Sequence, residues 1–174
     1  VTGAAGFIGA ALCKKLLDSK INVIGLDSLN NYYDRKLKLD RLKDIGCKHK
    51  ANECDWKFFN SCLEEEEHLK KIFDLYSPKI VVNLAAQAGV RYSLTNPQEY
   101  IKSNLVGFAN ILELSRKYNV ENFIYASSSS VYGGNESLPF KESDNVDHPI
   151  SLYAATKKSN EVIAHSYSHL YKIP

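Results

Sequence analysis

Two residues that could exchange a proton with a hydroxyl group lie four positions apart, Tyr153 and Lys157. The apolar spacing predicts a helix from residue 152 to about 171, which would place both on one face. A free phenol is a poor base at neutral pH, but a neighbouring ammonium group stabilises the phenolate. Such a pair could take a proton from a substrate hydroxyl and return it. On its own, the pair would also suit an ordinary helix surface.

Four consecutive serines precede this pair, at 127–130, directly after a predicted strand over residues 122–126. A serine hydroxyl at a strand end could hold the same substrate oxygen that the phenol deprotonates. The serine run therefore strengthens the interpretation of Tyr153 and Lys157 as a chemical pair.

A phosphate-binding turn is predicted at the start of the chain, where Gly3, Gly6 and Gly9 recur at every third position. Glycine tolerates a positive φ in a tight turn, and its missing side chain lets backbone N–H groups approach a ligand. A helix beginning there offers unpaired N–H donors and the positive end of its dipole. The following apolar residues have helical spacing: Phe7, Ile8, Leu12, Leu16 and Leu17. A turn with no ligand is the simpler alternative for glycines at this spacing.

An acidic residue, Asp27, ends the second apolar run, which covers residues 21–26. In a dinucleotide-binding fold, a carboxylate about 20 positions past the glycines binds the ribose hydroxyls. It would also repel a 2′-phosphate, which favours NAD over NADP. The alternative for Asp27 is a turn-forming residue at a strand end.

The rest of the chain alternates between strand and helix patterns. A helix with a solvated basic face is predicted from Asp34, its apolar side formed by Leu37, Leu39, Leu42 and Ile45 and its basic side by Arg35, Lys36, Lys38, Arg41 and Lys43. Strands are predicted at 56–60 and 80–86, helices at 64–76 and 99–117, and a polar loop at 133–149. This order predicts a doubly wound parallel sheet, a Rossmann fold, with ligands at the carboxyl ends of its strands.

Size and composition suggest one domain over residues 1–174, with 44% hydrophobic residues, 24% charged residues and a net charge of +2. These values favour neither nucleic acid nor a membrane as a partner. The first residue is Val1, the chain contains no methionine, and it stops at Pro174 in the middle of a pattern. We therefore expect a fragment of a larger protein, truncated at both ends.

The four cysteines are Cys13, Cys47, Cys54 and Cys62, and no two of them have a Cys-x-x-Cys spacing. We expect reduced thiols in a cytoplasmic protein and no zinc site, although His49 lies near Cys47.

Nearly the whole chain resembles the NAD domain of the extended short-chain dehydrogenase/reductase family, in its nucleotide-sugar epimerase/dehydratase branch. The features that carry the resemblance are the opening glycines, Asp27, the Tyr-x-x-x-Lys pair and the Ser-Ser-Ser-Val-Tyr-Gly sequence at 128–133. Three stretches are similar to UDP-glucuronate 4-epimerases in particular: residues 84–93, 103–107 and 147–158.

The resemblance implies a role for each matching position. NAD would be bound by Gly3, Gly6, Phe7, Ile8, Gly9, Asp27, Asn31 (or Asn30), Leu84, Ala85, Ala86, Asn104, Tyr153 and Lys157. Tyr153 would be the base, tuned by Lys157, with Ser128 as the catalytic serine. Ser129 and Ser130 would face the sugar, and they or Arg91 would hold a substrate carboxylate. An acidic residue that usually contacts adenine has no counterpart here, since Cys62 and Leu63 occupy its place.

The activity that the resemblance implies is 4-epimerisation of a UDP-sugar by transient oxidation at carbon 4. A 4,6-dehydratase is the first alternative, but its Asp-Glu pair is replaced by Ser129-Ser130. A UDP-glucose 4-epimerase and a non-enzymatic NAD-binding regulator are the other two. Dimerisation through the helices at 99–117 and 152–171 is also implied. The resemblance further implies that this chain is the N-terminal NAD domain of a two-part protein whose C-terminal part binds the substrate.

Overall fold

The computed structural model describes residues 1–49 and 55–174, apart from the side chains of residues 48 and 49. The predictions made for Cys54 and for the side chain of His49 lie outside these described residues.

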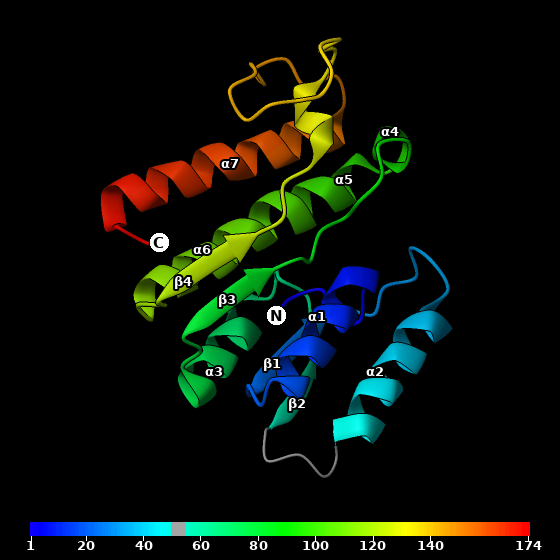
Figure 1. Ribbon diagram of the computed structural model, residues 1–174, viewed down its shortest axis with the longest axis vertical. Helices are drawn as coiled ribbons and strands as arrows, with labels where there is room; N and C mark the ends of the chain where they lie inside the picture. Colours follow the sequence, from blue (N-terminus) through cyan, green and yellow to red (C-terminus); the bar gives the residue numbers. More distant parts are fainter. Residues whose placement is uncertain (50–54) are drawn as a thin grey trace.

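A parallel sheet forms the centre of the molecule (Figure 1). Its strands are β1 (Val23–Asp27), β2 (Trp56–Asn60), β3 (Ile80–Asn83) and β4 (Asn122–Tyr125). β1 pairs with β2 and β3 pairs with β4, while Thr2 bridges in parallel to both Leu26 and Asn83. The order is therefore β2, β1, Thr2, β3, β4, and the first residues of the chain occupy the centre of a doubly wound sheet, as predicted.

Helices connect the strands and cover both faces. The long ones are α1 (Phe7–Asp18), α2 (Arg35–His49), α3 (Glu66–Tyr76), α6 (Gly107–Lys117) and α7 (Leu152–Tyr171). Four shorter segments complete the described elements: α4 (Tyr92–Thr95), α5 (Pro97–Tyr100), the π-helix η1 (Ile101–Val106) and the 3₁₀-helix η2 (Ser129–Tyr132).

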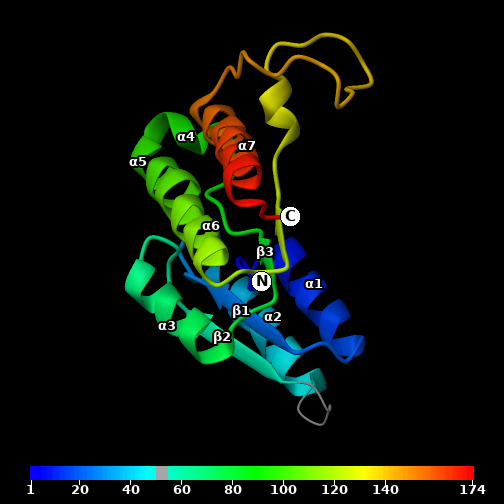
Figure 2. The ribbon, with the colours of Figure 1, turned by 90° about the vertical axis from the view of Figure 1, so that its left-hand side faces the viewer.

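Each face of the sheet has its own apolar core. α1 and α2 lie on one side and α3 and α6 on the other, with α7 packed on α6 (Figure 2). The first core contains Ala10, Cys13, Leu17, Val23 and Ile45. The second contains, among others, Leu69, Phe73, Phe108, Leu112 and Phe123. Burial on both faces explains why β1 is a nearly continuous apolar run.

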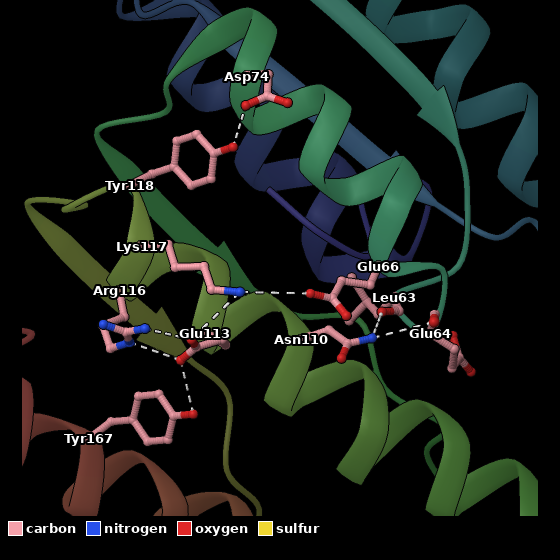
Figure 3. Close-up of polar contacts among 10 residues, drawn as sticks. All are labelled: Leu63, Glu64, Glu66, Asp74, Asn110, Glu113, Arg116, Lys117, Tyr118 and Tyr167. Atoms are coloured by element: carbon pink, nitrogen blue, oxygen red, sulfur yellow. Dashed lines mark hydrogen bonds and ion pairs between the residues drawn. The ribbon is translucent and has the colours of Figure 1, made fainter.

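Polar contacts hold α6 between its two neighbours on the second face (Figure 3). The Asn110 amide donates to the carbonyl oxygen of Leu63 before α3, at 3.0 Å. The Glu113 carboxylate accepts from the Arg116 guanidinium at 2.7 and 2.9 Å and from the Tyr167 hydroxyl of α7 at 3.2 Å. The bond from Arg116 is the main reason that the pKa of Glu113 is lowered. α6 thereby links the α3 side of the molecule to α7.

The element boundaries agree with the sequence for β2 and α7 and differ elsewhere. β3 ends at Asn83 rather than at residue 86, and α4 and η2 were not expected. The helix predicted over 99–117 is three consecutive segments, α5, η1 and α6.

The solvated basic face predicted for α2 was wrong, and the apolar residues with helical spacing in α1 are buried only in part. In α1 the buried residues are Gly9, Ala10, Cys13 and Leu17, whereas Phe7 and Ile8 are exposed. In α2, Lys38 is buried, and Leu37 and Leu39 are exposed. The reason in α2 is that Lys38 lies seven positions before Ile45, so both share the face that packs on the domain.

Candidate active site

The glycine turn joins the central segment to α1 at the carboxyl edge of the sheet. Gly3 has φ +67°, and a Cβ there would lie 2.9 Å from the backbone nitrogen of Ala85. A Cβ on Gly9 would overlap the Gly3 carbonyl oxygen. The N-cap of α1 is Gly6, which provides no side-chain cap for the first N–H groups of the helix. The turn is thus a close-fitting backbone cradle with donors available to an anion.

Asp27 lies beside this cradle at the end of β1 and is 5% exposed. Its Oδ2 accepts from the backbone nitrogen of Ala5 at 3.2 Å, within the glycine turn. Its Oδ1 accepts from the backbone nitrogen of Leu29 at 2.9 Å and from the Lys38 ammonium at 3.2 Å. The carboxylate is therefore fixed toward the turn by donors from three separate segments.

The end of β3 forms the opposite wall of the cradle. The Thr2 hydroxyl donates to Asn83 Oδ1 at 2.5 Å and accepts from the backbone nitrogen of Ala85 at 3.0 Å. Leu84, Ala85 and Ala86 continue past the strand end, half-buried, next to Gly3. The predicted cofactor wall and the predicted phosphate turn thus lie against each other.

Asn104 ties this wall to α7. Its Oδ1 accepts from the backbone nitrogen of Gln87 at 2.7 Å, and its Nδ2 donates to the Gln87 carbonyl at 3.0 Å and to Thr156 Oγ1 at 3.0 Å. Its own carbonyl accepts from Asn160 Nδ2 at 2.6 Å. Asn104 lies in the π-helical segment η1, a distortion that occurs often at functional sites.

Lys157 and Tyr153 lie on α7, next to the end of β4. The N-cap Ser151 starts this helix by accepting from the backbone nitrogen of Ala154 at 3.1 Å. The Lys157 ammonium is buried and donates to the carbonyl of Ala126 at 2.9 Å. Burial lowers the pKa of Lys157 to about 8. The ring of Tyr153 is half-buried and packs edge-on against that of Tyr100, with centroids 6.1 Å apart.

The serine run turns into η2, which packs on α7. Ser128 is the N-cap of η2, and its hydroxyl accepts from the backbone nitrogen of Ser130 at 3.2 Å. Ser128 follows Ala126 by two residues, so the contact of Lys157 places α7 beside the strand end that carries the serines. Ser129 is exposed and Ser130 half-buried.

The structure leaves two other predicted residues at the surface. Arg91 is exposed at the N-cap of α4. Asn31 is exposed as well, whereas its neighbour Asn30 accepts from the Lys38 ammonium at 3.0 Å.

Sequence reasoning missed Lys38 as a site residue, together with Thr156 and Asn160, which anchor Asn104. The spacing of Lys38 from the buried Ile45 was the available signal for the first of these. Thr156 and Asn160 bond Asn104 in the π-helical segment η1. Hydrophobic spacing does not reveal a π-helical segment, so the sequence contained no signal for these two residues.

The described part of the chain contains neither a metal-binding cluster nor a membrane-spanning helix. Within it, no three His, Cys, Asp or Glu side chains gather as a metal site requires. Among the same residues, no helix combines the length and apolar character needed to cross a bilayer. Among the described residues, Cys13, Cys47 and Cys62 are free thiols.

The parallel sheet order, the glycine turn beside Asp27 and the Tyr–Lys pair beside the β4 end define an extended short-chain dehydrogenase/reductase domain. Residues 1–174 match the family model described as GDP-mannose 4,6 dehydratase, and the chain belongs to that family.

Similar proteins include Protein CapI of Staphylococcus aureus, 60% identical over 100% of this chain and 50% of that protein. A probable UDP-glucuronate 4-epimerase of Rhizobium meliloti is 46% identical, again over 100% of this chain and 50% of the relative. The crystal structure of UDP-glucuronic acid 4-epimerase from Bacillus cereus, in complex with UDP-glucuronic acid and NAD, superposes with a TM-score of 0.87. It is 32% identical, over 99% of this chain and 52% of that one. The chain spans about half the length of the curated relatives it matches.

Proposed function

We propose that the protein to which this chain belongs is an NAD-dependent nucleotide-sugar 4-epimerase that converts UDP-glucuronate to UDP-galacturonate. One observation carries the proposal. The buried Lys157, one helical turn after Tyr153, contacts the carbonyl of Ala126 at the end of β4, two residues before Ser128, the N-cap of η2. Tyr153 and Lys157 lie near the same sheet edge as the glycine cradle, which supports their role as a proton-transferring pair. Names of the similar proteins support the substrate class.

The residues at this edge fit NAD. The cradle at Gly3 and Gly9 excludes any Cβ, which is expected where a pyrophosphate approaches the backbone. The Asp27 carboxylate accepts a hydrogen bond from Ala5 in the cradle and would bind the ribose hydroxyls. Phe7 and Ile8, exposed in the first turn of α1, contribute backbone N–H groups, and the wall of Leu84, Ala85 and Ala86 would line the other side. NAD, when bound, supplies the hydride acceptor and donor.

The chain's own residues would handle the proton. Tyr153 removes it from the 4-hydroxyl of the sugar and returns it after the ring has turned over. Lys157, still mainly protonated at neutral pH with a pKa of about 8, stabilises the phenolate and can hold the nicotinamide ribose. The Ser128 hydroxyl would hold the sugar oxygen, and Asn104 keeps the β3 wall in position against α7.

A uronic acid substrate carries a specific hazard. Oxidation at carbon 4 gives a β-keto acid, which loses carbon dioxide easily, so the pocket must hold the carboxylate. Ser129, Ser130 and Arg91 are the candidates for this role. The exposed position of Arg91 leaves its guanidinium available to a carboxylate.

Dehydration is disfavoured, despite the description of the family, because elimination of water needs an additional acid and base. The resemblance places these on an Asp-Glu pair where this chain has Ser129-Ser130. A non-enzymatic regulator is disfavoured because such a protein has no need for both Tyr153 and a buried Lys157.

We also propose a homodimer in which α6 and α7 face their counterparts, which light scattering of the full-length protein would test.

The test is to incubate the full-length protein separately with UDP-glucuronate and UDP-glucose and to identify the products by NMR. UDP-galacturonate from the first substrate, with far slower turnover of the second, supports the proposal. Turnover of UDP-glucose alone would replace it with a neutral-sugar 4-epimerase. NAD binding without turnover of either sugar would favour a regulator.

A further inference from the structure

A buried lysine pairs with the carboxylate that the fold presents to the cofactor ribose. Lys38 of α2 is 5% exposed, and its ammonium lies 3.2 Å from Asp27 Oδ1 and 3.0 Å from Asn30 Oδ1. The Lys38 ammonium also lies over the ring of Tyr33, 5.2 Å from the ring centroid. Burial of a charged lysine is costly unless the charge is compensated, and Asp27 compensates it.

A second cation lies close to the same place. The Arg41 guanidinium donates to the carbonyl of Ala5 in the glycine turn at 3.2 Å and to the Tyr33 hydroxyl at 3.0 Å. Asp27 itself bonds to the backbone nitrogen of Ala5, so Arg41 and Asp27 hold the same residue from two directions. The ribose end of the candidate site thus contains one carboxylate and two cations, rather than a carboxylate alone.

This balance of charge changes what Asp27 can exclude. A bare carboxylate repels the 2′-phosphate of NADP, but a carboxylate in close contact with an ammonium repels it much less.

We propose that Lys38 is a specificity-determining residue that weakens the preference of this site for NAD over NADP. The inference rests on the proposed function, since it assumes that Asp27 faces the adenosine ribose. Lys38 acts by compensating the charge of Asp27. Asp27 excludes NADP, and Lys38 limits that exclusion.

The experiment measures the dissociation constants of NAD⁺ and NADP⁺ by calorimetry, on full-length protein freed of co-purified cofactor. The readout is the ratio of the NADP⁺ constant to the NAD⁺ constant. Lys38→Met removes the charge but keeps an apolar stem of similar length, so we expect the ratio to rise about tenfold or more. Lys38→Arg keeps the charge and should stay within about threefold of the wild-type ratio. Lys36→Met, in an exposed pair with Asp40, is the matched control and should leave the ratio unchanged.

A merely structural lysine would give a different result, because its loss would weaken both cofactors together and leave the ratio constant. That outcome for Lys38→Met overturns the proposal. If Lys38→Met does not fold, Asp27→Asn decides: with Lys38 retained, its ratio should fall below that of the wild type, and an unchanged ratio overturns the proposal. Wild-type protein that binds neither cofactor would refute the proposed function itself, and the role of Lys38 with it.

Discussion

The two halves of the candidate site are built from different parts of the polypeptide. The glycine turn at 3–9 is made of backbone, and its close approach to Ala85 leaves no room for a Cβ on Gly3. The α7 half is made of side chains, with Lys157 on the carbonyl of Ala126 and Asn104 on Gln87 and Thr156. The first half should be sensitive to added volume, and the second to the loss of a single polar atom.

The largest effect is expected from an atom removed in the second half. Tyr153→Phe deletes only the hydroxyl that would transfer the proton and leaves the ring packed against Tyr100. We expect kcat on the sugar substrate to fall about 100- to 10,000-fold, with NAD affinity nearly unchanged. Steady-state kinetics and calorimetry on full-length protein check the two parts. Unchanged turnover would remove Tyr153 from the mechanism.

An added methyl group tests the first half. Gly9→Ala places a Cβ against the Gly3 carbonyl oxygen, so the turn must shift. We expect NAD affinity to fall about tenfold or more, the cost typical of an overpacked site. Gly46→Ala in α2 is the control, because a Cβ there meets nothing within 4 Å. It should leave NAD affinity unchanged and stabilise the helix by about 0.5–1 kcal/mol. Equal affinities for the two variants would show that the turn is not a close-fitting cradle.

The sequence revealed the halves unequally, for physical reasons. Glycines at fixed spacing and an acidic residue at a strand end are local signals, and so is a Tyr–Lys pair on a regular helix. Lys38 was assigned to solvent because a lysine on an amphipathic helix is usually exposed, and its partner Asp27 comes from a different element. The role of Asn104 was equally hidden, since its contacts reach residues 17 and 52 positions away.

The hydrogen bonds by which Asn104 connects Gln87 to α7 should contribute measurably to the free energy of unfolding. Asn104→Ala leaves the buried backbone groups of Gln87 without their partner, and we expect a loss of about 1–3 kcal/mol in the free energy of unfolding. Asn110→Ala, on the same stretch of helix, loses bonds to two partly buried carbonyls in Figure 3 and should cost less, about 1 kcal/mol. Urea denaturation compares them, and equal losses would contradict a special role for Asn104.

The smallest expected effect is the contribution of Lys157 to the pH dependence of the free energy of unfolding. Its pKa is lowered from 10.5 to about 8 by burial, so between these values the unfolded chain binds more protons at this residue than the folded protein. The contribution of Lys157 to stability therefore rises with pH, by about 1 kcal/mol between pH 8 and 9. Urea denaturation at both values should show this gain in the wild type relative to Lys157→Met. Burial raises the pKa of Cys13 to about 11, but that contribution is common to both proteins. If the free energy of unfolding changed equally with pH in the two proteins, a lowered pKa of the buried Lys157 would be contradicted.

The most direct test of the account follows the hydrogen on carbon 4 of the sugar. Full-length protein would be given UDP-glucuronate with deuterium at carbon 4, in ordinary water, and the product examined by NMR. A site that exchanges only the hydroxyl proton through Tyr153, and keeps the hydride within the pocket, predicts UDP-galacturonate that retains deuterium at carbon 4. Product with hydrogen at that carbon would contradict the account, because the hydrogen would have come from solvent.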